Sequence, residues 1–379
     1  MSWGQHLLRL GHQARLLPLP FPLSLRLNSW GRRLLWRLLS SRSPQESFVP
    51  PPAFCRRLWG LSFRFPLFNA AGMFKYAEGY NWAYRQGAGA YLVGTTTSRP
   101  RSGLRRDGIR QPFMSYVRSR AALNALGLPN PGHAVVARIL ERLPRYPNFP
   151  VGASVALDPE LPPQEALHLL LEGMRLYVAA GVDFIELNES CPNVPHDPAW
   201  NSSETRLRWI AEHFLSCRER SVPVIVKVSV DITPELLVAL LELLLELGYD
   251  GLCIGNTSTA YEGLLPTIAV EERPDFVAFW RRIGGGVSGA PIADRRRHLV
   301  RFATQWLAQQ RPKREFHIIA AGGILTPSDL SSALADGASL AEWYTGYIFA
   351  YAEHGERVYR WMASCLGASS YEGSATPLR

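Results

Sequence analysis

Residues 224–257 read V-I-V-K-V-S-V-D-I-T-P-E-L-L-V-A-L-L-E-L-L-L-E-L-G-Y-D-G-L-C-I-G-N-T. The two ends of this stretch, 224–229 and 251–257, are short apolar runs, which are typical of buried strands. The middle, 233–248, has the pattern of a helix, with Thr233 as N-cap, Pro234 at the first helical position and Gly248 as a stop. A strand, a helix and a second strand in this order predict a βαβ unit with parallel strands.

The same alternation extends along most of the chain. A second long helix is predicted over 163–181, and eight strand-like runs occur, at 66–72, 90–95, 150–156, 183–188, 224–229, 251–257, 317–323 and 341–347. Eight strands that alternate with helices predict an α/β fold of the TIM (β/α)8 barrel type. We expect a basic amphipathic extension over 1–50, a β-hairpin over 51–65, the barrel over 66–360 and a C-terminal tail over 361–379.

The positive charge of the chain is concentrated at its N-terminus. The 379 residues carry a formal net charge of +9, yet residues 1–60 hold nine arginines and a single acid, Glu46. This segment therefore contributes +8, and the other 319 residues are nearly neutral. Because the barrel itself carries so little net charge, a general nucleic-acid-binding surface is not expected.

The cysteines and the hydropathy pattern indicate the class of protein. Five cysteines are scattered at 55, 191, 217, 253 and 365, with no C-x-x-C pair, which favours a reducing compartment over a disulfide framework. No run approaches eighteen uninterrupted apolar residues, so a transmembrane helix is not expected. The apolar run 16–25 contains three prolines and lacks a small-residue cleavage site, which argues against a secretory signal.

The predicted strand ends indicate the chemistry of the site. They are rich in Gly, Asn, Thr and Lys and almost free of Asp and Glu, which argues against a divalent-metal site or a carboxylate-pair hydrolase. The A-G-G and Y-T-G stretches after the last two strands lie where such barrels bind phosphate. Lysine occurs only at 75, 227 and 313, and two of these positions lie at apolar strand ends. An anionic ligand is therefore expected at this end of the barrel.

Several ordered motifs resemble the FMN-dependent dihydroorotate dehydrogenase family, from about residue 58 to about residue 352. They are N-A-A-G-M-F-K (69–75), V-G-T-T-T-S-R-P (93–100), N-A-L-G-L-P-N-P-G (124–132), L-N-E-S-C-P-N-V-P (187–195), V-K-V-S (226–229), G-N-T-S (255–258), G-G-G-V-S-G-A-P (284–291), A-A-G-G-I (320–324) and Y-T-G (344–346). The resemblance implies oxidation of dihydroorotate to orotate in pyrimidine (UMP) biosynthesis, with FMN as hydride acceptor.

The family's roles carry over by position. Substrate contacts are implied for Lys75, Asn124, Asn188, Asn193, Asn256 and Thr257. Flavin contacts are implied for Ala71, Gly72, Lys75, Thr95, Ser154, Asn188, Lys227, Gly255, Gly289, Gly322, Gly323, Tyr344 and Thr345. Lys227 is expected near the flavin N1–C2 oxygen region, where an ammonium stabilises negative charge on the reduced ring. The sequence assigns no role to Glu189.

Cys191 occupies the position of the family's general base, in the loop after the fourth strand. The base removes a proton from C5 of dihydroorotate while hydride leaves C6 for the flavin. A free thiol has a pKa near 8.5, so a nearby positive charge would help to poise Cys191 for proton abstraction. Cys55, Cys217, Cys253 and Cys365 are interpreted as structural.

The motifs combine features of two branches of the family. Cys191 and the G-L-P-N loop resemble the soluble branch, which uses fumarate or NAD. Lys75, the G-T-T-T-S-R-P stretch and the long N-terminal arm resemble the quinone-dependent membrane branch, whose base is normally serine. A quinone is the favoured electron acceptor, and fumarate or NAD is the alternative. A related FMN barrel that reduces uracil-like rings and a flavin-binding protein without turnover are further alternatives.

The N-terminal arm is predicted to be helical and basic. In W-G-R-R-L-L-W-R-L-L (30–39), Trp30, Leu34 and Leu38 lie on one helical face and Arg33 and Arg37 on another. We expect peripheral contact with an anionic membrane on the cytoplasmic side through residues 1–50. A cleaved organellar transit peptide, which would imply mitochondria, and an arm without a partner in a cytoplasmic protein are the alternatives.

Overall fold

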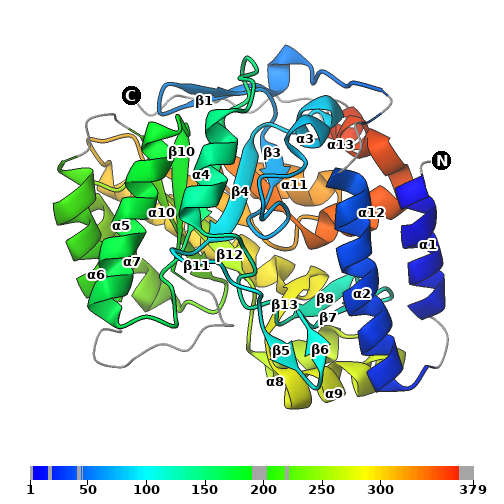
Figure 1. Ribbon diagram of the computed structural model, residues 1–379. Helices are drawn as coiled ribbons and strands as arrows, with labels where there is room; N and C mark the ends of the chain where they lie inside the picture. Colours follow the sequence, from blue (N-terminus) through cyan, green and yellow to red (C-terminus); the bar gives the residue numbers. More distant parts are fainter. Residues whose placement is uncertain are drawn as a thin grey trace.

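The structure is a computed structural model that describes residues 3–15, 19–40, 44, 46–189, 203–217 and 222–366. Eight strands form one parallel sheet in the order β3-β15-β14-β12-β11-β10-β9-β4 (Figure 1). The strands are β3 (Leu67–Asn69), β4 (Tyr91–Thr96), β9 (Val151–Val155), β10 (Phe184–Asn188), β11 (Val224–Ser229), β12 (Gly251–Asn256), β14 (His317–Ala321) and β15 (Leu340–Trp343). Each falls in one of the eight predicted runs or within one residue of it, and the TIM barrel is confirmed.

The barrel closes between its first two strands through a side chain. Asn69 donates from Nδ2 to the carbonyl oxygen of Leu92 at 2.6 Å, and its Oδ1 accepts from the Leu92 amide at 3.2 Å. Gly89 also donates its amide to the Leu67 carbonyl at 2.9 Å. The Asn69 amide therefore takes the place of a backbone partner at the edge where β3 meets β4.

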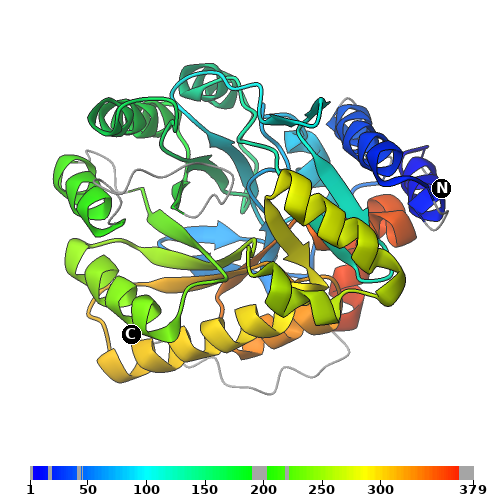
Figure 2. The ribbon, with the colours of Figure 1, turned by 90° about the horizontal axis from the view of Figure 1, so that it is seen from below.

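Helices surround the barrel, as Figure 2 shows in a view along it. They are α3 (Tyr80–Gln86), α4 (His133–Glu141), α5 (Pro163–Ala179), α6 (Ser203–Ile210), α7 (Pro234–Leu247), α10 (Ala293–Gln310), α11 (Pro327–Ala335), α12 (Thr345–His354) and α13 (Val358–Leu366). Helix α7 begins as predicted, because the Thr233 side chain accepts from the Leu236 amide and Pro234 follows it. Helix α13 continues to Leu366, so regular structure extends past residue 360, where the tail was expected to begin.

The barrel interior is layered. The lower layer is apolar and includes Phe68, Phe184, Ile225, Cys253 and Leu340, all buried. The antiparallel hairpin of β1 (Arg56–Leu58) and β2 (Leu61–Phe63) closes the lower end of the barrel and lies in the range expected for a hairpin. It places the Phe63 ring against the rings of Phe68 and Phe184. Because side chains on a strand alternate between two faces, residues two positions further along each strand also point inward.

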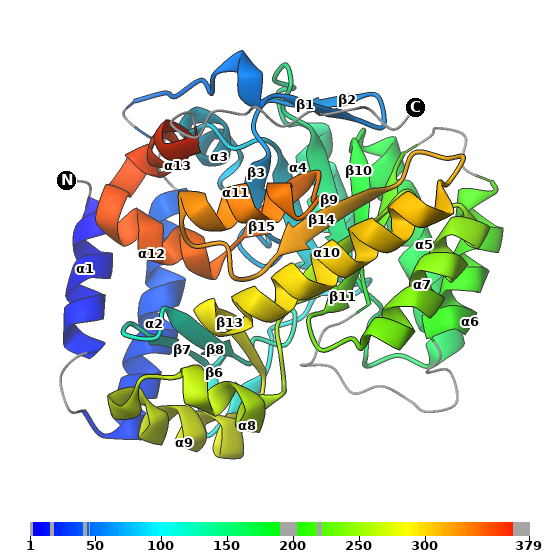
Figure 3. The ribbon, with the colours of Figure 1, turned by 180° about the vertical axis from the view of Figure 1, so that it is seen from behind.

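A small antiparallel sheet lies beyond the carboxyl ends of the barrel strands (Figures 1 and 3). It has the order β13-β8-β7, with β7 (Phe113–Tyr116), β8 (Ala121–Asn124) and β13 (Gly286–Gly289). Short strands β5 (Arg105–Arg106) and β6 (Ile109–Arg110) and helices α8 (Tyr261–Leu264) and α9 (Arg273–Ile283) accompany it. These insertions cover the end of the barrel at which the active sites of TIM-barrel enzymes lie.

The N-terminal arm forms two helices that pack on the barrel, α1 (Trp3–Arg15) and α2 (Phe21–Ser40) (Figure 3). Arg9 donates from Nε to the Ala352 carbonyl of α12 at 2.7 Å, and Trp36 donates from Nε1 to the Tyr344 hydroxyl at 3.0 Å. Leu25, Leu35 and Trp36 are buried. The arm is therefore packed against the rest of the chain and does not extend freely from it. Among the described helices, none is long and apolar enough to cross a membrane.

Candidate active site

A cavity opens at the carboxyl ends of the barrel strands, walled by the small sheet. All of the predicted site residues that the structure describes line it, except Ser154. They are Ala71, Gly72, Lys75, Thr95, Asn124, Asn188, Lys227, Gly255, Asn256, Thr257, Gly289, Gly322, Gly323, Tyr344 and Thr345. Cys191 and Asn193 lie outside the described residues. The cavity thus brings together side chains from β3 to β15, which are far apart in the sequence.

A row of hydrogen bonds crosses one wall of the cavity. The Ser154 and Thr95 hydroxyls lie 2.9 Å apart, and Asn188 donates from Nδ2 to the Thr95 oxygen at 2.9 Å. Asn256 in turn donates to the Asn188 Oδ1 at 3.3 Å. Ser154 therefore acts through Thr95 and does not line the cavity itself. Hydroxyls and amides held in this way present both donors and acceptors to a ring bound beside them.

Lys227 extends from β11 into the layer above the apolar floor and is 4% exposed. Its Nζ lies 3.2 Å from Glu186 Oε2 and 2.6 Å from Glu342 Oε2. Burial alone would lower the pKa of Lys227, but the two carboxylates outweigh it and raise the pKa well above its usual value. The side chain is therefore an ammonium at every physiological pH.

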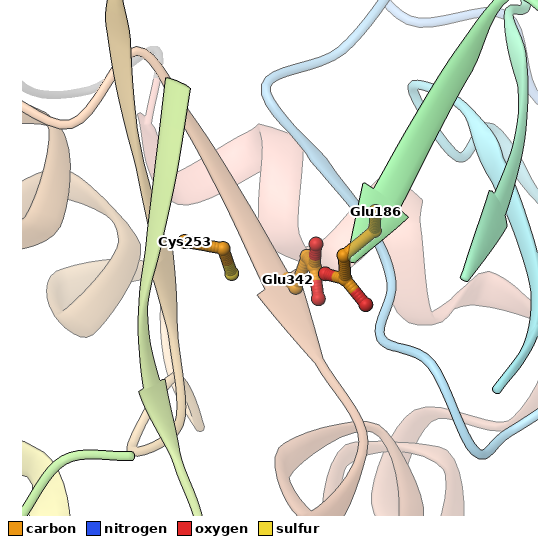
Figure 4. A group of neighbouring side chains, drawn as sticks. All are labelled: Glu186, Cys253 and Glu342. Atoms are coloured by element: carbon orange, nitrogen blue, oxygen red, sulfur yellow. The ribbon is translucent and has the colours of Figure 1, made fainter. Parts of the chain in front are cut away.

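The two acids beside Lys227 are also buried, each at 1% exposure. Figure 4 shows Glu186 of β10 and Glu342 of β15 pointing toward one another inside the barrel, with Cys253 of β12 nearby. Burial and the Glu186 carboxylate raise the pKa of Glu342 to about 8, because Lys227 offsets only part of their effect. Burial raises the pKa of the Cys253 thiol well above its usual value, so it is protonated.

Backbone glycines shape the other end of the cavity. A Cβ on Gly255 would lie 1.9 Å from the Ala321 carbonyl oxygen, and one on Gly322 would lie 2.6 Å from the Gly255 carbonyl oxygen. Both residues have positive φ, 119° and 80°, so glycine is required there for conformation and for space. Helix α12 begins beside them at Thr345, whose hydroxyl lies 2.8 Å from that of Ser288. A close backbone approach beside a helix N-terminus suits an anion such as phosphate.

Arg296 lies behind these glycines and is fully buried. Its Nε donates to the Gly322 carbonyl at 3.2 Å, which fixes the orientation of that peptide. Its two terminal nitrogens have no hydrogen-bond partner within the described part of the chain. Burial lowers the pKa of Arg296 to about 10, so the guanidinium remains charged and adds positive charge beneath the glycine loop.

Lys75 lies in the cavity wall and is 8% exposed. It stands in the loop after β3, six residues past the end of that strand. Glu189, to which the sequence analysis assigned no role, has a side chain that is 6% exposed and accepts from Arg206 Nε of α6 at 3.0 Å. Its amide also donates to the Lys227 carbonyl at 3.1 Å. Glu189 therefore anchors the end of β10, two residues before Cys191 in the sequence.

A second cavity of about 340 Å³ lies between α1, α2 and the barrel. Its walls are mainly apolar and include Leu8, His12, Leu27, Gly31, Arg32 and Leu35. Phe113 lines both cavities, and Trp36 of α2 is bonded to Tyr344 at the first one. His12 Nε2 and Arg32 Nε have no hydrogen-bond partner among the described residues. Burial lowers the pKa of His12 to about 4, so this ring is neutral.

The family model of dihydroorotate dehydrogenase matches residues 53–366. The chain belongs to the dihydroorotate dehydrogenase family. A Thermosynechococcus vestitus protein named dihydroorotate dehydrogenase (quinone) is 31% identical over 318 residues, 84% of this chain and 83% of the relative. A Nocardia farcinica protein of the same name is 31% identical over 342 residues, 86% of each chain. Both coverages place the resemblance along nearly the whole of each protein.

Solved structures of the family share the fold. The structure of DHODH from Eimeria tenella in complex with ferulenol superposes with a TM-score of 0.74 at 24% identity, over 89% of this chain and 90% of the other. The family model and the curated relatives confirm the family resemblance inferred from the motifs, and the structural likeness confirms the fold.

The sequence analysis missed four side chains that lie in or beside the cavity: Glu186, Ser288, Arg296 and Glu342. The two acids lie inside strands, two residues before the ends that were searched for polar groups. Period-2 alternation from Phe184 and Leu340 could have placed them on the interior face. Arg296 stands in the run R-R-R of α10, and its helical spacing to Leu299, Val300 and Ala303 could have placed it on the buried face.

Proposed function

We propose that this protein oxidises dihydroorotate to orotate in pyrimidine biosynthesis, with FMN as the hydride acceptor and a quinone as the electron acceptor. The single observation that carries the proposal is the convergence of Lys75, Lys227, the amide row and the glycine cradle on one cavity. Relatives named dihydroorotate dehydrogenase (quinone) agree with it. The purified protein should be yellow and should bleach when dihydroorotate is added without air; no bleaching would contradict the proposal.

The cavity fits FMN by shape and charge. Gly255, Gly289, Gly322 and Gly323 leave room for a phosphate beside the N-terminus of α12, where free amides favour an anion. Lys227 would face the pyrimidine end of the flavin ring, where an ammonium stabilises charge on the reduced form. Bound FMN supplies the hydride acceptor for the reaction. The Thr95 hydroxyl, shared between Ser154 and Asn188, would orient the ring edge.

The substrate is held by side chains on the outer wall of the cavity. Lys75 suits the orotate carboxylate, and Asn124, Asn188, Asn256 and Thr257 suit the edge of the pyrimidine ring. Asn124 is fixed by its Nδ2 bond to the Gly286 carbonyl at 3.3 Å. Cys191 is proposed as the base that accepts the C5 proton, with Asn193 as a further substrate contact. Phe113, Leu126 and Leu128 line the same cavity and exclude water from it.

The second cavity is proposed as the quinone site. A quinone is an apolar ring with two carbonyl acceptors, and this cavity offers apolar walls with two unsatisfied polar nitrogens, on His12 and Arg32. Contact through Phe113, which lines both cavities, brings the two sites close. Turnover measured with a quinone, with fumarate and with NAD as oxidants tests this assignment, and a faster rate with fumarate or NAD would contradict it.

Replacing Gly31 by phenylalanine should fill the second cavity. A Cβ at Gly31 meets nothing within 4 Å and Gly31 lines the cavity, so the ring enters open space without a backbone clash. We expect quinone turnover to fall by about tenfold or more, because the ring would displace at least one favourable contact of the quinone and about 1.4 kcal/mol corresponds to tenfold in affinity. Bleaching by dihydroorotate should be unchanged. Gly263→Phe, at another glycine with open space and without a positive φ but outside the cavity, is the control. Equal losses in both half-reactions would show that the cavity is not specific to the quinone.

Replacing Arg296 by leucine should weaken FMN binding by about tenfold, the effect of one lost charge-assisted hydrogen bond. The Gly322 carbonyl loses its donor, and the phosphate loses a positive charge beneath its loop. Riboflavin, which lacks the phosphate, should bind both proteins alike in a fluorescence titration. Arg297→Leu on the same helix is the control, because Arg297 is 40% exposed and its partner Asp336 retains Arg301. A parallel loss of riboflavin affinity would indicate general damage to the site.

Peripheral membrane contact is proposed for the exposed side of α2. Leu23, Leu27 and Trp30 are 45%, 46% and 57% exposed, and their spacing of four and three places them on one helical face. An apolar face on a segment of high positive charge suits an interface with anionic lipid. Sedimentation with anionic vesicles at low and high salt is the measurement, and no binding at low salt would contradict the proposal.

A further inference from the structure

Three charged side chains are buried together in the barrel: two acids and one base. Lys227 Nζ is within ion-pair distance of both Glu186 and Glu342, at 3.2 and 2.6 Å. The Cys253 sulfur and one oxygen of each carboxylate lie within 4.8 Å of one another. Such a group could ligate a metal, but here the Lys227 ammonium already serves as the cation of both carboxylates.

One ammonium neutralises only one carboxylate. If both acids were ionised, the cluster would carry a net negative charge in the barrel interior, where uncompensated charge is costly. Two carboxylates that share a site usually retain one proton between them. Consistent with this, Glu186 Oε1 is buried without a hydrogen-bond partner among the described residues. A proton placed between the two acids would supply this oxygen with a hydrogen bond.

No other charge within the described residues compensates the pair. On the neighbouring strands, the residues in register with the cluster are uncharged at neutral pH. They are Ser154 of β9, Cys253 of β12, Ala321 of β14 and Phe68 of β3. Among the residues that the structure describes, Lys75 is the only further charged side chain that lines the cavity. The protonation of the carboxylate pair therefore sets the charge of the cluster.

We propose that Glu342 is a positioning residue that shares one proton with Glu186 and thereby sets the charge that Lys227 presents to the flavin. Lys227 and Glu342 both line the flavin cavity, whereas Glu186 lies behind them. With the shared proton the cluster is neutral, and without it the cluster is negative. The inference rests on the proposed function only in taking flavin as the occupant of the cavity.

The shared proton couples to flavin reduction. A hydride brings two electrons and one proton to the ring and leaves it negatively charged near Lys227. A negative cluster opposes this charge, so the carboxylate pair takes up a proton from solvent when the ring is reduced and returns it when two electrons leave for the acceptor. At low pH the pair already holds the shared proton. Above the pH at which the oxidised protein loses that proton, reduction of the flavin therefore consumes one proton more than it does at low pH.

The test is the flavin midpoint potential as a function of pH, measured with mediators and without dihydroorotate, in the FMN-loaded wild type and in Glu342→Gln. Glutamine imitates the protonated carboxyl at every pH. Near pH 6 we expect the two proteins to have equal midpoint potentials. Above about pH 8 the wild-type potential should fall more steeply with pH than that of Glu342→Gln. The difference in slope should be about 30 mV per pH unit, the value for one extra proton per two electrons. Glu246→Gln, at an exposed acid of α7, should follow the wild type.

Thermal unfolding of the flavin-free proteins gives a second readout. The folded chain keeps a proton on Glu342 that the unfolded chain loses near its ordinary pKa, so wild-type stability should fall as pH rises from about 4.5 toward 8. Glu342→Gln lacks this loss, and its melting temperature should exceed that of the wild type at pH 9 but not at pH 5.

The outcomes separate this inference from the proposed function. Identical pH dependence of potential and of melting in wild type and Glu342→Gln would overturn the shared proton, even if dihydroorotate bleaches the flavin. Diverging potentials together with no bleaching by dihydroorotate would uphold the shared proton and overturn the proposed substrate. A protein that binds no flavin would overturn the coupling as well as the proposed function.

Discussion

Replacing Cys191 by alanine is expected to leave FMN binding intact and to slow flavin reduction by dihydroorotate by ~10²–10⁴, the usual contribution of a positioned base. The S-C-P-N loop that carries Cys191 follows directly on β10. The bond between Glu189 and Arg206 anchors the end of that strand. Stopped-flow absorbance after mixing with dihydroorotate is the measurement, and in the wild type the rate should rise with pH as the thiol ionises.

Two further variants make the Cys191 result specific. Cys191→Ser should retain part of the activity, because serine is the base in the quinone-dependent branch that the motifs also resemble. Cys217→Ala, at an exposed cysteine beyond α6, should behave as the wild type. A Cys191→Ala protein that is reduced at the wild-type rate would assign the base to another residue.

Replacing Lys227 by alanine is expected to have the largest effect on the whole protein. The two buried acids lose the ammonium that bridges them, and removing one partner of a buried ion pair costs about 3–5 kcal/mol. FMN should bind more weakly and be reduced more slowly, because charge on the reduced ring loses its partner. Denaturant unfolding and flavin titration measure the two effects. Lys313→Ala, at an exposed lysine, is the control.

Stability and chemistry can be separated at this position. Lys227→Met combined with Glu186→Gln and Glu342→Gln removes all three charges, and a neutral cluster of similar volume should recover most of the lost stability. Flavin reduction should remain slow in this triple variant. Lys227→Arg should not restore the rate fully, since a planar guanidinium does not fit the space of an ammonium. A wild-type rate in the triple variant would show that Lys227 has no role beyond folding, whereas a wild-type rate in Lys227→Arg would show that only the net charge at this position matters.

For the N-terminal arm, the helical pattern predicted the helix but not the face that is buried. Its sequence predicted a basic helix over 30–39, and α2 covers that range. The pattern placed Trp30, Leu34 and Leu38 on one apolar face, but the barrel buries Leu25, Leu35 and Trp36 and leaves Trp30 exposed. A helix with apolar residues around much of its circumference offers more than one face. Which face is buried depends on the surface that it meets.

The sequence by itself determined the barrel and its eight strands, because these follow from local periodicity. It also determined about half of the cavity-lining residues, through short motifs that resemble those of the family. Only the tertiary structure decided that Glu186, Lys227 and Glu342 form one cluster. They stand on three strands, 41 and 115 residues apart in sequence, and meet through barrel closure. Their charge coupling depends on distance and burial, which no single segment encodes.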